Sequence, residues 1–192
     1  MPPKFKFTKE EIIEASLNMV RENGIESITA RSLAERLGSS SKPVFSLFSN
    51  MDEVLLETVQ AVRNIYNQYI TKGLSSEIPF KGVGMQYILF AINEPNFFKL
   101  LFMSNLGEAS DALSTLPNID DNYKGILNSV QKQYAFSEWE SKRLYKHLWI
   151  YTHGIASLIA TGVCSFTAEE ISNMITEVCK SLVESLKGER QL

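Results

Sequence analysis

The sequence predicts an all-α protein, and three observations support this fold class. Apolar residues recur at the three- and four-residue spacing of amphipathic helices along most of the 192-residue chain. A hydroxyl side chain stands three residues before a carboxylate at Thr8–Glu11 and at Ser137–Glu140, which is the capping-box pattern that begins a helix. No segment shows the convincing alternation of apolar and polar residues that a half-buried strand requires.

Composition narrows the class of protein. Hydrophobic residues make up 44% of the chain, which is enough for a core and excludes extensive disorder. The longest weakly polar stretch, Gly154–Phe166, is too short for a membrane-spanning helix, which needs about 20 residues. The first residues contain no apolar run typical of a secretion signal. Cys164 and Cys179 form no CxxC pair, so we expect free thiols in a cytoplasmic protein that does not contact a membrane.

Start and stop signals place three short helices in the first 50 residues. The first runs from the Thr8 cap to Asn23 and Gly24, and the second begins at Thr29 and stops at Gly38. Three serines, residues 39–41, then open a third helix. Its first turn contains a proline, where the missing N–H group is tolerated.

Longer helices are predicted in the rest of the chain. Asn50 begins a fourth helix that ends near Lys72, and residues 73–79 and 104–118 are predicted to be loops. The other predicted helices are 80–102 with a break at Asn93, Glu94 and Pro95, then 119–135, 138–162, and a last helix capped by Thr167.

Residues 29–48 have the pattern of two helices joined by a tight turn. A small residue in the first helix lets the second approach closely, and a glycine permits the turn. Apolar residues spaced by four supply the buried face of each helix. The residues with these roles are Leu33, Ala34, Leu37, Gly38, Val44 and Phe48.

The outer side of this segment can contact DNA. A short second helix can enter the major groove, and its hydroxyl and ammonium groups can reach bases or phosphates. Residues 1–50 carry seven basic and six acidic side chains, whereas the rest of the chain is net acidic, an asymmetry in the direction that DNA binding needs. The predicted DNA-binding residues are Thr29, Arg31, Ser39, Ser40, Ser41, Lys42, Val44, Phe45, Ser46 and Phe48.

The first 60 residues resemble the DNA-binding domain of the TetR family of transcriptional regulators. The family pattern has an aliphatic residue followed by alanine, a glycine, a serine, an aliphatic–tyrosine pair, a phenylalanine, and then Ser-Lys-Glu before a leucine. Two positions depart from it, because Phe45 stands where tyrosine is usual and Met51 where lysine is usual. The residues that carry the resemblance are Asn23, Gly24, Thr29, Leu33, Ala34, Gly38, Ser40, Val44, Phe45, Phe48 and residues 50–55.

The second half resembles a C-terminal, ligand-binding domain group of the same family. Trp149, His153 and Gly154 match its W-x3-H-G signature in the penultimate helix. The resemblance implies that the last two helices pair with those of a second copy, giving a homodimer that reads a palindromic operator in double-stranded DNA. For His153 the alternative is an ordinary buried histidine at a helix contact.

Large apolar side chains in residues 80–102 and 123–151 are candidates for the wall of an effector pocket. An apolar cavity with few polar groups is the usual form of a small-molecule site, although each of these residues could instead serve the core. The scarcity of charge favours an apolar or aromatic effector. The predicted pocket residues are Met85, Tyr87, Phe90, Phe97, Phe98, Phe102, Tyr123, Tyr145, Trp149 and His153.

Enzyme motifs are not found in the sequence. It contains no GxSxG, P-loop, dinucleotide-binding or HExxH motif, and we expect neither a cofactor nor a metal. His147 and His153 lie on different faces of one helix and cannot share a metal ion.

The sequence therefore predicts a DNA-binding domain in residues 1–55, built from three helices, and a larger helical effector-binding and dimerisation domain in residues 56–192. The predicted function is a repressor that its effector releases from DNA. Two alternatives remain: an interaction or ligand-binding protein whose helix-turn-helix has lost DNA binding, and a helical enzyme.

Overall fold

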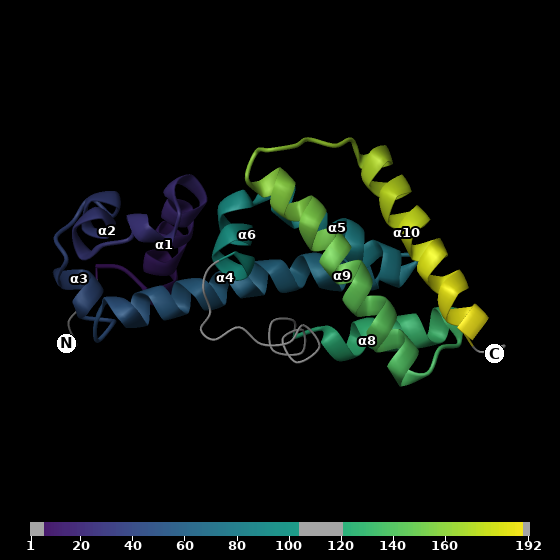
Figure 1. The fold of residues 1–192 in the computed structure, drawn as a ribbon. Coiled ribbons are helices and arrows are strands. Elements are labelled where there is room, and N and C mark those ends of the chain that lie inside the picture. The colour runs from purple at the N-terminus through teal and green to yellow at the C-terminus, as the bar shows by residue number, and fades with distance from the viewer. Residues whose placement is uncertain (1–5, 104–120, 190–192) are drawn as a thin grey trace. The chain divides into compact units, whose positions relative to one another are not determined.

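A computed structural model describes residues 6–103 and 121–189 of the chain (Figure 1). These residues form nine α-helices and one short 3-10 helix, and no strand occurs among them. The predicted all-α class is confirmed. The predicted loop 104–118 and the first residues of the helix predicted at 119–135 lie outside the described residues.

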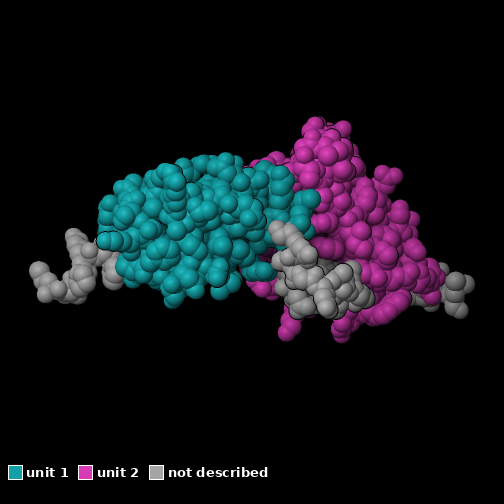
Figure 2. Space-filling model, turned by 60° about the vertical axis from the view of Figure 1, so that its left-hand side comes forward, with its two compact units in different colours: residues 1–65, 94–104 teal, residues 66–93, 105–192 magenta. Residues whose placement is uncertain are grey.

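The chain divides into two compact units, which Figure 2 colours separately. Unit 1 takes its described residues from Met1–Ile65 and Glu94–Ser104, and unit 2 from Tyr66–Asn93 and Asn105–Leu192. The predicted domain boundary at residue 55 stays a prediction.

Unit 1 contains the N-terminal helices. Its elements are α1 (Lys9–Asn23), the 3-10 helix η1 (Ile25–Ser27), α2 (Ala30–Arg36), α3 (Lys42–Phe45), the first part of α4 (Met51–Leu74) and α6 (Pro95–Phe102). Fully buried apolar side chains from five of these helices form its core, among them Ile12, Val20, Leu33, Val44, Val54, Phe97 and Phe98.

The predicted caps set the ends of these helices. Thr8 and Glu11 form the capping box of α1, with the Glu11 N–H donating to the Thr8 hydroxyl at 3.2 Å. Helix α1 ends at Gly24, whose φ of 81° is a conformation that favours glycine. The Glu53 N–H donates to the Asn50 side chain at 2.9 Å at the start of α4.

Unit 2 contains the rest of α4 and the C-terminal helices. These are α5 (Pro79–Asn93), α8 (Tyr123–Tyr134), α9 (Glu138–Ala160) and α10 (Ala168–Glu189). The predicted break before Pro95 is confirmed, because α5 ends at Asn93 and α6 begins at Pro95. Helix α5 packs against α8, α9 and α10, so it is central to this unit.

Glycines bring α4 and α5 close together in unit 2. A Cβ atom on Gly73 would lie 2.8 Å from the Gly82 backbone, and one on Gly82 would overlap the Ser76 hydroxyl and the Gly73 carbonyl. A Cβ atom on Gly84 would lie 3.6 Å from both Ile175 and Thr152, which is an ordinary van der Waals distance. Gly73 and Gly82 therefore permit the close approach of α4 and α5.

Candidate DNA interface and ligand cavity

Helices α2 and α3 form the predicted helix-turn-helix. Gly38 adopts a φ of 58° between them, a left-handed conformation that other residues rarely take. The Ser39 N–H donates to the Ala34 carbonyl at 2.9 Å, and the Gly38 N–H donates to the Glu35 carbonyl at 3.0 Å. These bonds satisfy the last carbonyls of α2 and direct the chain into α3.

Helix α3 presents one face to the core and another to solvent. Val44 and Phe48 are buried, whereas Lys42 and Ser46 are exposed and Phe45 is 46% exposed. A buried side chain cannot reach a groove of DNA, so Val44 and Phe48 support the helix instead of contacting DNA as predicted. Pro43 lies in the first turn, as the sequence predicted.

The other predicted DNA-binding residues lie around this exposed face. Thr29 is exposed and caps α2 by accepting from the Ser32 N–H at 3.1 Å. The Arg31 side chain is 90% exposed, and its ion pair with Glu35 is long at 3.9 Å. The remaining three, Ser39, Ser40 and Ser41, are exposed or half-buried in the turn.

Lys6 is a cation near the turn that sequence analysis did not single out. Its ammonium donates to the Ser39 hydroxyl at 3.2 Å and lies 3.5 Å from the Gly38 carbonyl. Lys6 precedes the first capping box, where no helical periodicity marks a position as important. The only sequence signal is its positive charge at the start of the chain.

Lys9 connects α1 to α4. Its ammonium lies 3.1 Å from Glu53 and 3.0 Å from Glu57, and it stands 4.6 Å from the centre of the Phe48 ring. Hydrogen bonding by the Ser49 backbone, together with Lys9, lowers the pKa of Glu53 to about 2, so this carboxylate stays charged at neutral pH. The cluster fixes the chain that follows α3 to the start of α4.

Arg21 connects α1 to α6. Its guanidinium donates twice to Glu94, at 2.8 and 3.0 Å, and lies 4.9 Å from the centre of the Phe97 ring. The Asn96 side chain donates to the Arg21 carbonyl at 3.0 Å. A planar ion pair with two hydrogen bonds fixes the relative orientation of its partners and also contributes to stability. Helix α6 is therefore held firmly in unit 1.

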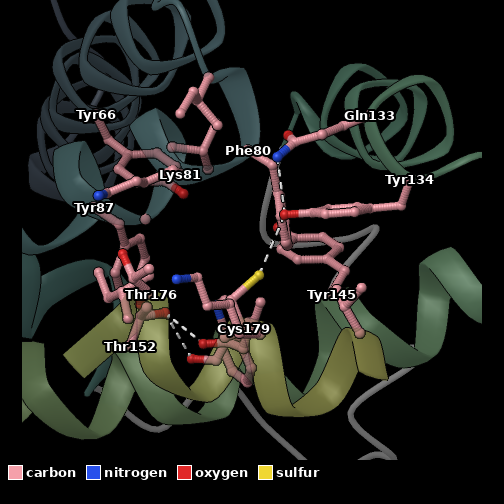
Figure 3. A pocket seen from close by; sticks show the side chains of 18 residues that line it. Tyr66, Phe80, Lys81, Tyr87, Gln133, Tyr134, Tyr145, Thr152, Thr176 and Cys179 are labelled. Carbon is pink, nitrogen blue, oxygen red and sulfur yellow. Dashed lines mark hydrogen bonds between the residues drawn. The ribbon is translucent and has the colours of Figure 1, made fainter. Parts of the chain in front are cut away.

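Unit 2 encloses a cavity of about 320 Å³, shown in Figure 3. Its walls come from α4, α5, α8, α9, α10 and the chain just before α5. Tyr66, Lys81 and Tyr87 are labelled on the left of this view, and Gln133, Tyr134 and Tyr145 on the right. The lining residues are Tyr66, Ile78, Phe80, Lys81, Val83, Gly84, Tyr87, Gln133, Tyr134, Tyr145, Leu148, Trp149, Thr152, Ile175, Thr176, Cys179, Lys180 and Val183.

Three of the ten predicted pocket residues line this cavity: Tyr87, Tyr145 and Trp149. Phe90 is fully buried in the core of unit 2, while Met85, Tyr123 and His153 are half-buried and do not line the cavity. Phe97, Phe98 and Phe102 are part of α6 in unit 1, because Pro95 starts a separate helix that packs on α1. These seven residues therefore do not line the cavity, although the sequence analysis predicted that they would.

His153 supports the cavity wall through two lining residues. Its Nδ1 lies 2.9 Å from the Tyr87 hydroxyl, and its ring stacks on Trp149 with centroids 5.2 Å apart. Burial lowers the pKa of His153, so the ring is neutral at pH 7. The W-x3-H spacing places the two rings one helical turn apart and makes this stacking possible.

Cys179 is a lining residue that the sequence did not indicate. Its thiol lies 3.4 Å from the Tyr134 hydroxyl, and burial raises the pKa of both groups. At neutral pH the thiol is therefore protonated and a weak nucleophile.

Neither a membrane span nor a metal site is found among the described residues. No helix there is long and apolar enough to cross a membrane. No group of three or more histidine, cysteine, aspartate or glutamate side chains could hold a metal ion within residues 6–103 and 121–189.

Comparison with known proteins identifies the fold. No protein-family model and no curated protein matches the chain. Two of the solved structures that match the chain cover nearly its full length. A transcriptional regulator from Rhodococcus sp. Rha1 has a TM-score of 0.63 at 14% identity, covering 93% of this chain and 97% of that one. A TetR variant from Acinetobacter baumannii AYE, in complex with minocycline, has a TM-score of 0.54 at 16% identity, covering 96% and 99%.

The chain has a TetR-type fold. The resemblance to the TetR family is thus confirmed at the level of the fold, and the C-terminal group indicated by Trp149, His153 and Gly154 stays a prediction. In this TetR-type fold the helix-turn-helix lies in unit 1 and the cavity in unit 2.

Proposed function

We propose that this protein is a DNA-binding transcriptional regulator, and not an enzyme, that represses genes from a palindromic operator in the cytoplasm. The observation that carries the proposal is the exposed face of α3, with Lys42, Phe45 and Ser46 on the outside and Val44 and Phe48 in the core. A helix held in this way can place its outer residues in the major groove.

A homodimer is part of this proposal, because one short recognition helix reads too few bases. Two copies can occupy successive major-groove faces about 34 Å apart. Ile150, Gly154 and Leu158 follow one another at four-residue spacing on α9. Ile150 is 51% and Leu158 is 40% exposed, and a Cβ atom on Gly154 would meet nothing within 4 Å. This open apolar stripe supports pairing through α9 and α10.

The cavity is the proposed effector site. Its volume of about 320 Å³ lies at the small end of ligand sites, and its walls are rich in aromatic side chains. The matching Acinetobacter protein holds minocycline, so this type of fold can accommodate a small molecule with fused rings. We therefore propose an apolar or aromatic effector that binds here.

Coupling between effector and DNA requires that the effector prefer one arrangement of the dimer over another. Helix α4 is a single continuous helix, Met51–Leu74, and includes residues of both units. We propose α4 as the element that transmits the change.

DNA binding at several salt concentrations tests the proposed function. A dimer that contacts six or more phosphates should lose about a thousandfold in affinity between about 50 and 200 mM salt. It should also prefer one genomic fragment, from the operator region, over the others. Fluorescence anisotropy with fragments of the source genome measures both properties.

A protein that binds no fragment at low salt would contradict this proposal. That result favours the second candidate, an interaction protein whose helix-turn-helix no longer binds DNA. Phe45 and Met51 are the observations behind this candidate, because they replace a phosphate-binding hydroxyl and a cation of the family pattern.

A further inference from the structure

The cavity in unit 2 is lined by two lysines and by no carboxylate, and this imbalance of charge points to a class of ligand. We propose that the cavity binds an amphipathic organic acid. Its apolar or aromatic body lies among the aromatic side chains, and its anionic group pairs with Lys81 and Lys180. The inference rests on the proposed effector function of the cavity and adds the chemistry of the ligand.

The two lysines come from different helices. Lys81 stands in the first turn of α5 and Lys180 in the middle of α10, and both line the same cavity. The first turn of α5 contains no acidic residue, so the partial positive charge of the helix start adds to that of Lys81. Two elements that are far apart in sequence thus each contribute a lysine to the cavity wall, Lys81 half-buried and Lys180 exposed.

Neither lysine is neutralised by the part of the chain that the structure describes. Seven ion pairs occur there, at Lys9 (two), Arg21, Arg31, Arg36, Lys142 and Arg143, and none includes Lys81 or Lys180. Lys142 and Arg143 of the same unit do have acidic partners, Glu138 and Glu189. Lys72, Lys124, Lys132, Lys146 and Lys187 of unit 2 are in none of these ion pairs either, so the feature that distinguishes Lys81 and Lys180 is their place in the cavity wall.

Other polar groups of the wall are already satisfied or neutral. The Thr152 hydroxyl donates to the Leu148 carbonyl at 2.9 Å, and the Thr176 hydroxyl donates to the Ser172 carbonyl at 2.6 Å. The neighbouring His153 is neutral because burial lowers its pKa. The ammonium groups are consequently the strongest donors that a ligand meets, and a hydrogen bond to an anion is about twice as strong as one between neutral groups.

The rest of the wall suits a flat apolar body. Tyr66, Phe80, Tyr145 and Trp149 contribute rings, and Val83, Leu148 and Val183 fill the space between them. A cationic ligand would be repelled by both lysines. A neutral ligand would gain no charge-assisted hydrogen bond from the two ammonium groups.

Two fluorescent probes with the same ring system test the proposal: the anion 1-anilinonaphthalene-8-sulfonate and the neutral N-phenyl-1-naphthylamine. The full-length protein should bind the sulfonate about tenfold more tightly, or better, which equals the contribution of one charge-assisted hydrogen bond. The double variant Lys81→Gln/Lys180→Gln should lose this preference and keep its affinity for the neutral probe. Lys187→Gln, an exposed lysine on the same α10 that does not line the cavity, is the matched control and should change neither affinity.

Cys179 reports whether a probe occupies the cavity. In a Cys164→Ser variant it is the only thiol, and a bound probe should slow its alkylation by N-ethylmaleimide, as measured by mass spectrometry.

Equal affinity for both probes, or a preference for the sulfonate that survives the double variant, would overturn the organic-acid inference. If the neutral probe still protects Cys179, the proposed effector cavity stands. If neither probe protects Cys179, both the inference and the effector cavity are wrong.

Discussion

Single residues of α3 have opposite surroundings although they adjoin in the chain. Val44 is fully buried, whereas Phe45 is 46% exposed at the position where the family pattern has tyrosine. An exposed phenyl ring can contact a thymine methyl group, but it cannot donate to a phosphate. The specificity that α3 provides must therefore depend more on Lys42 and on the serines around it than in proteins with the tyrosine.

Lys42→Ala tests this conclusion at the scale of one residue. Lys42 is exposed at the start of α3, so its removal should not disturb the fold. We expect operator affinity to fall by about 1–3 kcal/mol if the ammonium contacts a base, and the change should be larger on the operator than on random DNA.

Lys187→Ala is the control, because it removes the same charge from an exposed position of α10. An unchanged affinity for the operator in the Lys42 variant would exclude Lys42 from the interface.

At the scale of elements, local signals predict the helices better than the cavity. Thr8, Gly24, Gly38 and Pro95 mark helix ends through hydrogen bonds and backbone angles that involve only nearby residues. A cavity wall depends on which helix faces meet, and this is decided by packing between residues far apart in sequence.

Side chains of α10 show the limit of sequence reasoning. Cys179 is small and Lys180 is charged, so neither has the sequence features of a pocket-wall residue. Helix α10 nevertheless packs on α5 and α9, and both residues line the cavity. Conversely, Phe97 and Phe98 have the size and hydrophobicity of wall residues. They belong to the core of unit 1 because Pro95 separates α6 from α5.

The crossing of α4 and α5 supports a prediction about stability. Gly82→Ala places a methyl group onto the Ser76 hydroxyl and the Gly73 carbonyl, and backbone cannot move aside as a flexible side chain can. Alanine normally stabilises a helix by up to about 1 kcal/mol relative to glycine. Here we expect a net loss of about 1–3 kcal/mol from overpacking.

Urea unfolding followed by circular dichroism measures this loss. Gly188→Ala is the control, because an added Cβ there meets nothing within 4 Å. A Gly82→Ala protein as stable as the Gly188→Ala protein would show that the two helices are not packed as closely as described.

At the scale of the whole molecule, the function depends on how many copies act together. DNA recognition by one α3 and regulation by one cavity are separate events in a monomer. They become linked when two copies hold their recognition helices at a spacing that an effector can change. The apolar stripe on α9 is thus as important for the proposed function as the DNA-contacting face.

Ile150→Glu/Leu158→Glu tests the stripe directly. Both side chains are 40% exposed or more, so the isolated chain should fold, but two carboxylates would be buried without partners in a pair of α9 helices. We expect light scattering at micromolar concentration to show a dimer for the natural sequence and a monomer for the variant. Operator affinity should fall far more than after Lys42→Ala, because a monomer lacks one half of the DNA interface.

Ile92→Glu, at an exposed apolar position on α5, is the control and should leave the dimer intact. A natural protein that is monomeric at this concentration would contradict the dimer, and a double variant that stays dimeric would place the interface on another surface.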